Sequence, residues 1–414
     1  MKKVLIIGNS AKEYALAKKM SEYCKVYVLP GSATMKDFAE IVDIRPNSSK
    51  EILEFVMEND IDLTIPTDRI CLNTNLTELF EKNNQLIFAP SRASMSATAE
   101  KSAAKKFMYK LKIPTPKFGI FEKQALVNDY IKNIKGPFVI KTNEPNSAII
   151  LTSAKSAKII LDSLYAENPG KIIIEDYVWG TPFAFYCITD GYKALPIGSS
   201  ILYKHSLEGD GGQITEGMGA CSPNYKLSFE NECFLTENVI YPTIEFLEKQ
   251  GTPYSGIIGV NGILTEDNTI EVLGYQSFMQ DADCAGIIEL IDSNLYDLFE
   301  ACAMGTFSDE VSYIGQKNMS AVSVVLSCKT KENQQNVISG IEDIDEDCKI
   351  SFSRNTKINK YLEYEADYGS VAVVTAFGGT VSSASEKAYE EVANINFKGV
   401  NYRKDICKPV LSAF

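Results

Sequence analysis

The first ninety residues alternate short apolar runs with helix-like segments, and this alternation limits the possible folds more than any other feature of the chain. The apolar runs KVLIIG, KVYVLP and LTIP are separated by stretches such as EYALAKKM and KEILEFVMEND. Strands that alternate with helices at this spacing need crossover connections, which produce a parallel sheet. We therefore expect a Rossmann-like domain over residues 1–100.

The middle of the chain has a different pattern, typical of antiparallel hairpins. FVIKT and AIILT flank the turn-rich NEPNS, and FAFYCITD ends in an Asp190-Gly191 turn. The last ninety residues combine strands such as SVAVVTAFG with a helix in SASEKAYEEVANI. We expect a mixed α/β and α+β protein, with a second domain at 101–310 that contains a flap subdomain at about 115–190, and a small α+β domain at 311–414.

Composition narrows the classes of partner and the cell compartment. The formal net charge of −13 argues against a nucleic-acid-binding protein, which would need clustered Lys and Arg to neutralise phosphates. No apolar run approaches the roughly 18 residues of a membrane helix, and the start of the chain does not resemble a signal peptide. Ten scattered cysteines without a CxxC pair indicate reduced core thiols. We expect a soluble cytoplasmic protein.

Several segments could bind an anionic ligand. Gly8, Asn9 and Ser10 follow a strand and open a helix, where backbone N–H groups attract anions, but a tight turn without a ligand is equally compatible. The glycine fingerprint of a dinucleotide site is missing, which disfavours a Rossmann dehydrogenase. Lys101 begins a helix and Lys141 ends an apolar strand, so either ammonium group could meet a phosphate or simply reach solvent.

Two further segments are rich in glycine or acidic residues. The stretch from Gly209 to Gly219 has enough glycine for its backbone to approach a ligand closely, with a disordered surface loop as the alternative. QSFMQDAD, from Gln276 to Asp283, could hold Mg²⁺ through oxygen ligands or could be a helix cap. The strand KIII ends in Glu175-Asp176-Tyr177-Val178, where backbone groups could pair with an adenine edge while a carboxylate orients a lysine or ribose, with a solvated turn as the alternative.

In this order the segments resemble the phosphoribosylamine-glycine ligase family, ATP-grasp enzymes of purine synthesis. GNSAKEYA at Gly8 to Ala15, AEKSAAKKF with Lys101, and GDGGQITEGMGACSP at Gly209 to Pro223 are similar to the family's opening, phosphate and substrate loops. The YRKDI ending also matches. The resemblance implies an ATP-grasp fold with an N-terminal Rossmann-like domain and a C-terminal α+β domain.

The resemblance also implies roles for individual residues. ATP would be bound by Lys101, Lys141, Glu175, Asp176, Tyr177 and Val178. Phosphoribosylamine and glycine would be bound by Gly8, Asn9, Ser10, Asp210, Thr215, Gly217, Met218 and Gly219. Asp210 and Asp281 would be catalytic, and Gln276 with Asp281 would hold Mg²⁺ or Mn²⁺. A monomer or homodimer is expected.

The departures from the family pattern lie in the nucleotide and metal segments. NEPNS replaces a longer glycine-rich loop, which predicts a plain hairpin turn too short to close over a triphosphate. In the metal motif, Gly274 stands at the position of a glutamate, Gln276 at an asparagine and Phe278 at an arginine. Two hypotheses follow. One is a working ligase that forms glycinamide ribonucleotide through a glycyl phosphate; the other is a diverged paralogue that binds a nucleotide or sugar phosphate as an accessory or regulatory protein.

Overall fold

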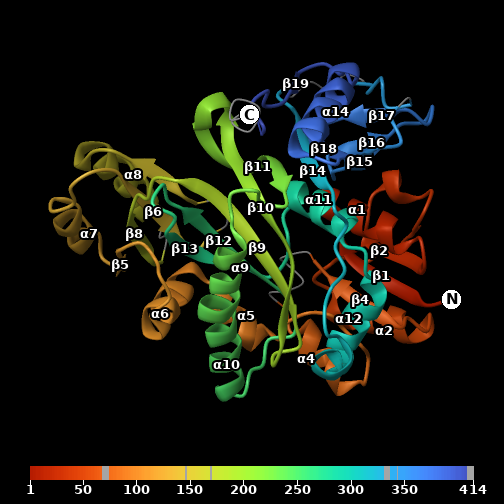
Figure 1. Cartoon of the computed structure of the whole chain (residues 1–414), viewed down its shortest axis with the longest axis horizontal. Helices are drawn as coiled ribbons and strands as arrows, with labels where there is room; N and C mark the ends of the chain where they lie inside the picture. Colours follow the sequence, from red (N-terminus) through yellow and green to blue (C-terminus); the bar gives the residue numbers. More distant parts are fainter. Residues whose placement is uncertain (68–73, 145–146, 168–169, 331–335, 343, 408–414) are drawn as a thin grey trace.

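The computed structural model describes the chain except for residues 68–73, 145–146, 168–169, 331–335, 343 and 408–414. Its N-terminal module is a four-stranded parallel sheet in the order β3-β2-β1-β4 (Figure 1). The strands are β1 (Lys3–Gly8), β2 (Lys25–Pro30), β3 (Glu40–Ile41) and β4 (Leu63–Pro66). The helices are α1 (Ala11–Met20), α2 (Ser49–Glu58), α4 (Leu76–Lys82) and α5 (Arg92–Ala99), with a 3-10 turn at Ala33–Met35. The predicted Rossmann-like arrangement is confirmed.

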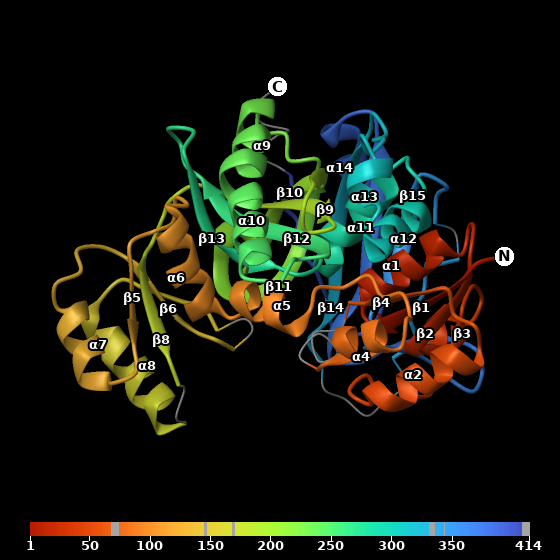
Figure 2. The same cartoon turned by 90° about the horizontal axis from the view of Figure 1, so that it is seen from below.

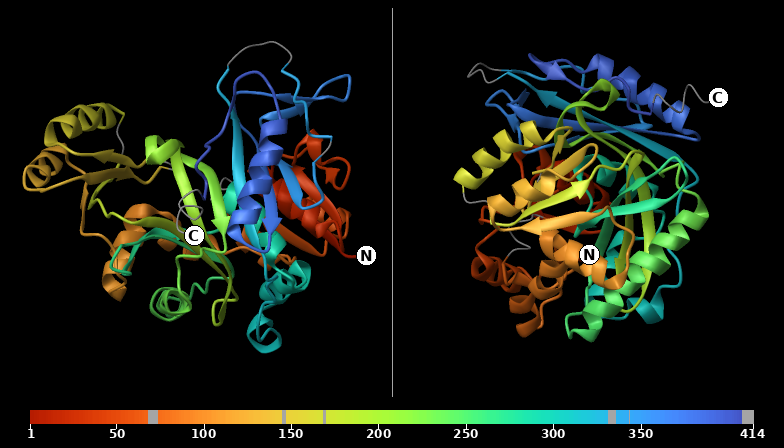
Figure 3. Two further views of the ribbon diagram at one scale, coloured as in Figure 1. Left: turned by 45° about the horizontal axis from the view of Figure 1, so that its top comes forward. Right: turned by 90° about the vertical axis from the view of Figure 1, so that its left-hand side faces the viewer.

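A small antiparallel sheet, in the order β5-β8-β6-β7, projects to one side of the molecule (Figure 3). It contains β5 (Phe118–Phe121), β6 (Phe138–Thr142), β7 (Ile149–Leu151) and β8 (Ile172–Asp176). Its helices are α6 (Lys101–Leu111), which leads into it, α7 (Gln124–Ile131) and α8 (Ala154–Ala166). The hairpin β6–β7 is antiparallel, as the sequence predicts. Pro145 and Asn146 of its turn lie outside the described residues.

A nine-stranded sheet forms the centre of the molecule, in the order β13-β12-β9-β10-β11-β14-β18-β15, with β19 beside β14. The strands from the middle of the chain are β9 (Thr181–Thr189), β10 (Ala194–Leu207), β11 (Gly211–Ser222), β12 (Gly256–Leu264) and β13 (Ile270–Gln276). The C-terminal strands are β14 (Ser320–Cys328), β15 (Cys348–Phe352), β18 (Gly369–Gly378) and β19 (Val400–Asn401), and β16 (Thr356–Ile358) pairs separately with β17 (Tyr364–Ala366). The predicted C-terminal α+β segment thus extends the same sheet.

Helices cover the large sheet because its strands are apolar on both faces. Along β9, Phe183, Phe185 and Cys187 belong to one buried cluster, and Ala184 and Tyr186 belong to another. Figure 2 shows α10 on one side of these strands, while α11 lies between the sheet and α1. The helices of the middle and C-terminal parts of the chain are α9 (Phe229–Leu235), α10 (Tyr241–Lys249), α11 (Asp281–Leu290), α12 (Leu295–Met304), α13 (Phe307–Glu310) and α14 (Val381–Asn394). A 3-10 turn lies at Glu208–Asp210 and a π-turn at Thr236–Ile240.

The cysteines differ from the expectation in one respect. Cys221 on β11 and Cys407 near the C-terminus form a disulfide, so the prediction of uniformly reduced thiols is wrong for this pair. Sequence spacing could not reveal it, because the two residues are 186 positions apart and meet only when the C-terminal arm reaches β11. Cys71 lies outside the described residues. In the part of the chain that the structure describes, no helix combines the length and apolar character needed to cross a bilayer.

The N-terminal module is fixed to the large sheet through aromatic packing. The rings of Phe88, which follows α4 and pairs with β4, and Phe299 on α12 stack with centroids 4.1 Å apart. Both are almost fully buried. We expect Phe299→Ala to lower the free energy of unfolding by about 3–5 kcal/mol, because it leaves a cavity at this junction. Urea denaturation measures the change, and Phe229→Ala, which removes an exposed ring, is expected to stay within about 0.5 kcal/mol of the unaltered chain.

Candidate active site

The loop between β1 and α1 is occupied by carboxylates of the chain itself. The Ser10 backbone N–H and Oγ donate to Glu13 Oε2 at 2.6 and 2.5 Å, and Thr67 Oγ1 donates to the other oxygen. Gly8 has a φ of +147°, and a Cβ there would lie 2.4 Å from the Glu13 side chain. Burial alone would raise the pKa of Glu13, but Lys12 and these donors outweigh it and lower the pKa. Glycine at position 8 is therefore required for the carboxylate to reach the loop.

Asp281 joins the same loop from the first residue of α11. Its Oδ1 lies 2.7 Å from Ser10 Oγ, whose single hydrogen it shares with Glu13, and it accepts from the Lys12 backbone N–H at 3.2 Å. Burial raises the pKa of this carboxyl, and Lys12 partly opposes the shift. A phosphate at Gly8, Asn9 and Ser10 would compete with two carboxylates for the donors of the α1 N-terminus.

The two predicted ATP lysines both lie at the β6–β7 hairpin: Lys141 is on β6, and Lys101 contacts the turn from the start of α6. Lys101 Nζ donates to the Glu144 carbonyl at 2.5 Å and to Ser147 Oγ at 2.9 Å. Asn143 accepts from the Ser102 backbone N–H at 3.0 Å, which attaches the hairpin turn to the start of α6. The short turn therefore contacts the lysine that the sequence assigns to phosphate.

Glu175 has the position of a carboxylate that orients a lysine, which is one of the two roles that the sequence allows it. Its side chain is buried, and it forms ion pairs with Lys141 and, at 2.7 Å, with Lys105. Burial raises the pKa of Glu175, but the two lysines outweigh it and lower the pKa. The carboxylate of Glu175 thus orients Lys141. Only the backbone that follows Glu175 belongs to the hinge, the segment from Asp176 to Val178. Sequence reasoning missed Lys105, although its spacing of four residues from Lys101 places both on one face of α6.

Lys105 also connects the small sheet to the large one. Its Nζ donates to Thr115 Oγ1 at 2.6 Å, and Thr115 Oγ1 donates to the Val272 carbonyl on β13 at 2.7 Å. Burial lowers the pKa of Lys105 to about 8, with Glu175 opposing the shift. Electrostatic contacts therefore extend from β8 through α6 to the large sheet.

The hinge from Asp176 to Val178 continues the chain from the end of β8. The backbone N–H of Asp176 donates to the Lys117 carbonyl, and that of Tyr177 donates to the Pro137 carbonyl. The Tyr177 ring lies edge-on to Trp179, with centroids 4.7 Å apart, and the Trp179 side chain is exposed. An apolar surface beside this backbone suits a planar base.

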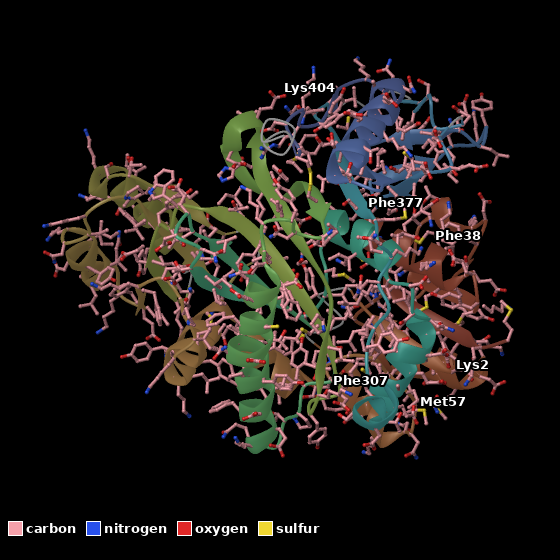
Figure 4. All side chains as sticks on the ribbon, in the orientation of Figure 1. Lys2, Phe38, Met57, Phe307, Phe377 and Lys404 are labelled. Atoms are coloured by element: carbon pink, nitrogen blue, oxygen red, sulfur yellow. A yellow bond between two sulfur atoms is a disulfide. The ribbon has the colours of Figure 1, made fainter. Side chains whose placement is uncertain are left out.

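The loop between β10 and β11 is held by the C-terminal arm. Arg403 Nη1 donates to Asp210 Oδ1 at 2.9 Å, and the Gly209 backbone N–H donates to Asp405 Oδ2 at 2.9 Å. In Figure 4, Lys404 lies at this arm beside the loop, and its backbone N–H donates to Glu208. Sequence reasoning matched the YRKDI ending without assigning Arg403 or Asp405 to the site. The signal that could have identified these two residues is the charged YRKDI motif itself, close to the end of the chain.

The predicted substrate-loop residues fall into two groups. Thr215 Oγ1 donates to the Lys204 carbonyl at 2.8 Å and accepts from the Gly217 N–H, so these residues shape the open part of the loop. Met218 is buried, and a Cβ at Gly219 would lie 2.6 Å from the Ser323 carbonyl on β14. Met218 and Gly219 therefore pack the loop against the sheet.

The predicted metal residues are separated in the structure. The Tyr186 hydroxyl lies 2.8 Å from Gln276 Oε1 and 2.5 Å from Asp283 Oδ2, whereas Asp281 contacts the α1 loop. Positions i and i+2 of a helix point to different sides, so only Asp283 faces Gln276. Burial raises the pKa of Asp283 to about 6. Nearby Lys204 has its pKa lowered by burial, and Asp283 opposes that shift. Among the described residues, no cluster of three His, Cys, Asp or Glu side chains could hold a metal.

These features define the class of protein. A small antiparallel sheet beside a large one, joined to it by a buried ion-pair network, and a lysine near the end of a strand of the small sheet are the features of an ATP-grasp protein. Models of the three phosphoribosylglycinamide synthetase domains match the chain: the N domain at residues 2–97, the ATP-grasp (A) domain at 99–284 and the C domain at 321–409. The chain belongs to the phosphoribosylglycinamide synthetase family, and the resemblance seen in the sequence is confirmed.

Individual relatives match nearly the whole chain. The phosphoribosylamine–glycine ligase of Caldanaerobacter subterraneus subsp. tengcongensis is 27% identical, with 98% of this chain and 99% of the relative covered. That of Helicobacter pylori is 29% identical, with 99% and 97% covered. The crystal structure of the Thermotoga maritima phosphoribosylamine–glycine ligase has a TM-score of 0.81 at 22% identity, covering 97% of this chain and 99% of that chain. A Campylobacter jejuni biotin carboxylase complex has a TM-score of 0.72 at 15% identity, with 97% and 92% covered. The predicted ATP-grasp fold is thereby confirmed.

The ion pairs of Glu175 give a test of the lysine arrangement. We expect Glu175→Gln to lower the free energy of unfolding by about 3–5 kcal/mol, because it leaves two buried ammonium groups without their shared carboxylate. Glu245→Gln removes an exposed pair with Lys249 and should change it by less than about 1 kcal/mol. Urea denaturation of both variants measures the difference. Equal effects would show that Glu175 does not compensate the lysine charges.

Proposed function

We propose that this chain is an ATP-dependent carboxylate-amine ligase that joins phosphoribosylamine and glycine to form glycinamide ribonucleotide. The observation that carries the proposal is the ordered β10–β11 loop, held by the buried Arg403 in a chain that matches all three family domains. The glycine carboxylate takes the γ-phosphoryl group of ATP to give glycyl phosphate and ADP. The amine of phosphoribosylamine then attacks the acyl carbon and phosphate leaves.

The described residues support a division of roles. Lys141, oriented by Glu175, and Lys101, at the hairpin turn, would neutralise phosphate charge. The backbone of Asp176 to Val178 would face adenine. The open loop around Asp210 and Thr215 to Gly217 would hold glycine and the ribose phosphate. Gly8 to Ser10 would contribute through backbone groups that Glu13 and Asp281 do not already occupy. We propose structural roles for Met218 and Gly219, which pack the loop from below.

A divalent cation fits the residues that are present, although not the pair that the sequence predicted. Gln276 and Asp283 bring an amide and a carboxylate together at Tyr186, and Mg²⁺ or Mn²⁺ prefers such oxygen ligands. A bound cation would neutralise charge on the phosphates during transfer. Asp281, which contacts Ser10 and Lys12, is proposed to organise the α1 loop. We further propose a cytoplasmic monomer or homodimer.

The experiment that tests the function is ADP release by the purified chain with ATP, Mg²⁺, glycine and freshly prepared phosphoribosylamine. We expect release that depends on both glycine and phosphoribosylamine. Release of ADP without glycine would indicate a different acid substrate. Absence of turnover together with a melting temperature unchanged by ATP would contradict the ligase and favour a diverged accessory protein.

Lys101 offers a matched pair of variants. Lys101→Met is expected to lower kcat about 10²- to 10³-fold, because it removes a preorganised positive charge from the phosphate site. Lys106→Met, an exposed position on the same helix, should leave kcat unchanged. Steady-state ADP release compares the two, with urea denaturation to confirm folding. Equal kcat values for the two variants would remove Lys101 from the catalytic machinery.

A further inference from the structure

The disulfide between Cys221 and Cys407 ties the C-terminal arm, residues 402–407, to the strand that leaves the β10–β11 loop. Cys221 lies next to the last residue of β11, and Cys407 ends the arm whose Arg403 and Asp405 hold that loop. Both cysteine side chains are fully buried. The bond therefore fixes one end of the arm, while the other end of the arm contacts the loop assigned to substrate.

Without the disulfide, the arm depends on weaker contacts. The Cys407 backbone N–H donates to the Tyr203 hydroxyl at 2.9 Å, and the Ile406 side chain packs against β11. Arg403 pairs with Asp210, but the Asp210 side chain is 57% exposed, so solvent weakens this ion pair. Each hydrogen bond contributes modestly, because water replaces its partner when the arm detaches. The covalent bond is thus the strongest connection between the arm and β11.

The arm can open without disturbing the large sheet. Residues 402–407 belong to no helix or strand, and β19, which precedes them, pairs with β14. Opening the arm therefore breaks side-chain contacts and single hydrogen bonds but no strand pairing. Local openings of this kind expose buried groups to solutes while the rest of the protein stays folded. A buried disulfide in such a place can still react with thiols in solution.

The other cysteines indicate which kind of disulfide this is. Cys71 lies outside the described residues, and the seven other cysteines that the structure describes are free thiols, six of them buried. Proteins of oxidising compartments use several disulfides as a framework, whereas a disulfide in a reducing compartment is usually transient and redox-sensing. A single disulfide among free thiols therefore suits reversible reduction in the proposed cytoplasmic setting.

We propose that Cys221 and Cys407 form a thiol–disulfide switch that controls how firmly the β10–β11 loop is held. In the disulfide form the arm stays on β11, and Arg403 and Asp405 keep the loop in place. In the dithiol form the arm detaches more often and the loop loses this support. The inference rests on the proposed ligase function, because that function assigns the loop to glycine and the ribose phosphate.

The switch needs a thiol as reductant and a disulfide as oxidant, and a low-molecular-weight pair such as reduced and oxidised glutathione provides both. A glutathione thiolate attacks one sulfur of the protein disulfide, which forms a mixed disulfide and releases the other cysteine as a thiolate. A second glutathione thiolate attacks the glutathione sulfur of the mixed disulfide and releases the second cysteine. The cysteine thiolates take protons from water, and one oxidised glutathione forms. The reverse steps reoxidise the pair.

The first test compares oxidised and reduced protein by hydrogen–deuterium exchange, without any substrate. Residues 205–219 and 402–407 should exchange about 10-fold faster after reduction, because the arm then opens without a covalent tether. The strands β9 and β12 should exchange at the same rate in both states. Mass spectrometry after thiol alkylation in denaturant should count two more thiols in the reduced protein.

Two serine variants give a matched comparison. Cys407→Ser removes the disulfide permanently, and Cys233→Ser on α9 is the control, because Cys233 is a free and only partly buried thiol. Cys407→Ser should show fast exchange of the loop under both redox conditions, whereas Cys233→Ser should keep the difference between them. The unaltered chain carries the test even if Cys407→Ser misfolds, since oxidation and reduction need no substitution.

Steady-state ADP release connects the switch to the reaction. The KM values for glycine and phosphoribosylamine should rise about 10-fold on reduction, because the loop assigned to these two substrates is then less ordered. The KM for ATP should stay the same, because ATP is assigned to the small sheet and the hinge.

Equal exchange of the β10–β11 loop in oxidised and reduced protein would overturn the proposal, as would equal thiol counts or substrate KM values that do not depend on the redox state. Redox-dependent exchange without ADP release in either state would leave the switch standing and reject the ligase. ADP release from a chain whose loop exchange ignores the redox state would reject the switch and leave the ligase standing.

Discussion

The buried carboxylate of Glu175 forms the interactions on which the arrangement of the small sheet, α6 and the large sheet depends. It joins β8 to α6 through Lys105 and to β6 through Lys141, and Thr115 extends the chain of contacts to β13. Two ammonium groups in a weakly solvated interior would repel each other and lose hydration without this carboxylate. Because both lysines pair with this carboxylate, the small sheet takes a defined orientation towards the large one, and Lys141 is held near the end of its strand.

The same principle explains the other charged parts of the site. Glu13 and Asp281 both accept from donors at the start of α1, and Asp283 accepts from Tyr186. Each of these buried carboxylates pairs with donors of the chain, and its pKa depends on how completely this pairing compensates its burial. The pKa of Glu13 is lowered, whereas the pKa values of Asp281 and Asp283 are raised. The incompletely compensated carboxyls are at the N-terminus of α11, near the proposed cation.

The sequence predicted those features that depend on the residues of one continuous segment. Alternating strands and helices predicted the parallel sheet, the apolar runs around NEPNS predicted the β6–β7 hairpin, and the ordered motifs identified the family. Features that depend on two distant segments were not predicted. The sequence allowed Glu175 to orient a lysine or a ribose, but it could not single out Lys105 and Lys141 as its partners, because they lie on other elements. The disulfide between Cys221 and Cys407 was missed for the same reason.

The metal motif shows most clearly how a reading along one segment differs from a reading across neighbouring segments. Read along β13, the replacement of a carboxylate by Gly274 is simply a loss, and Asp281 is the acid that remains in the matching position. Read across the sheet, the neighbouring strand places Asn261 opposite the gap, and α11 turns Asp283 rather than Asp281 towards Gln276. In a sheet, a residue shares its face with the directly opposed residues on neighbouring strands as well as with residues two positions along its own strand. A residue that departs from a family motif should therefore be compared with the directly opposed residue on the neighbouring strand as well as with its neighbours along the chain.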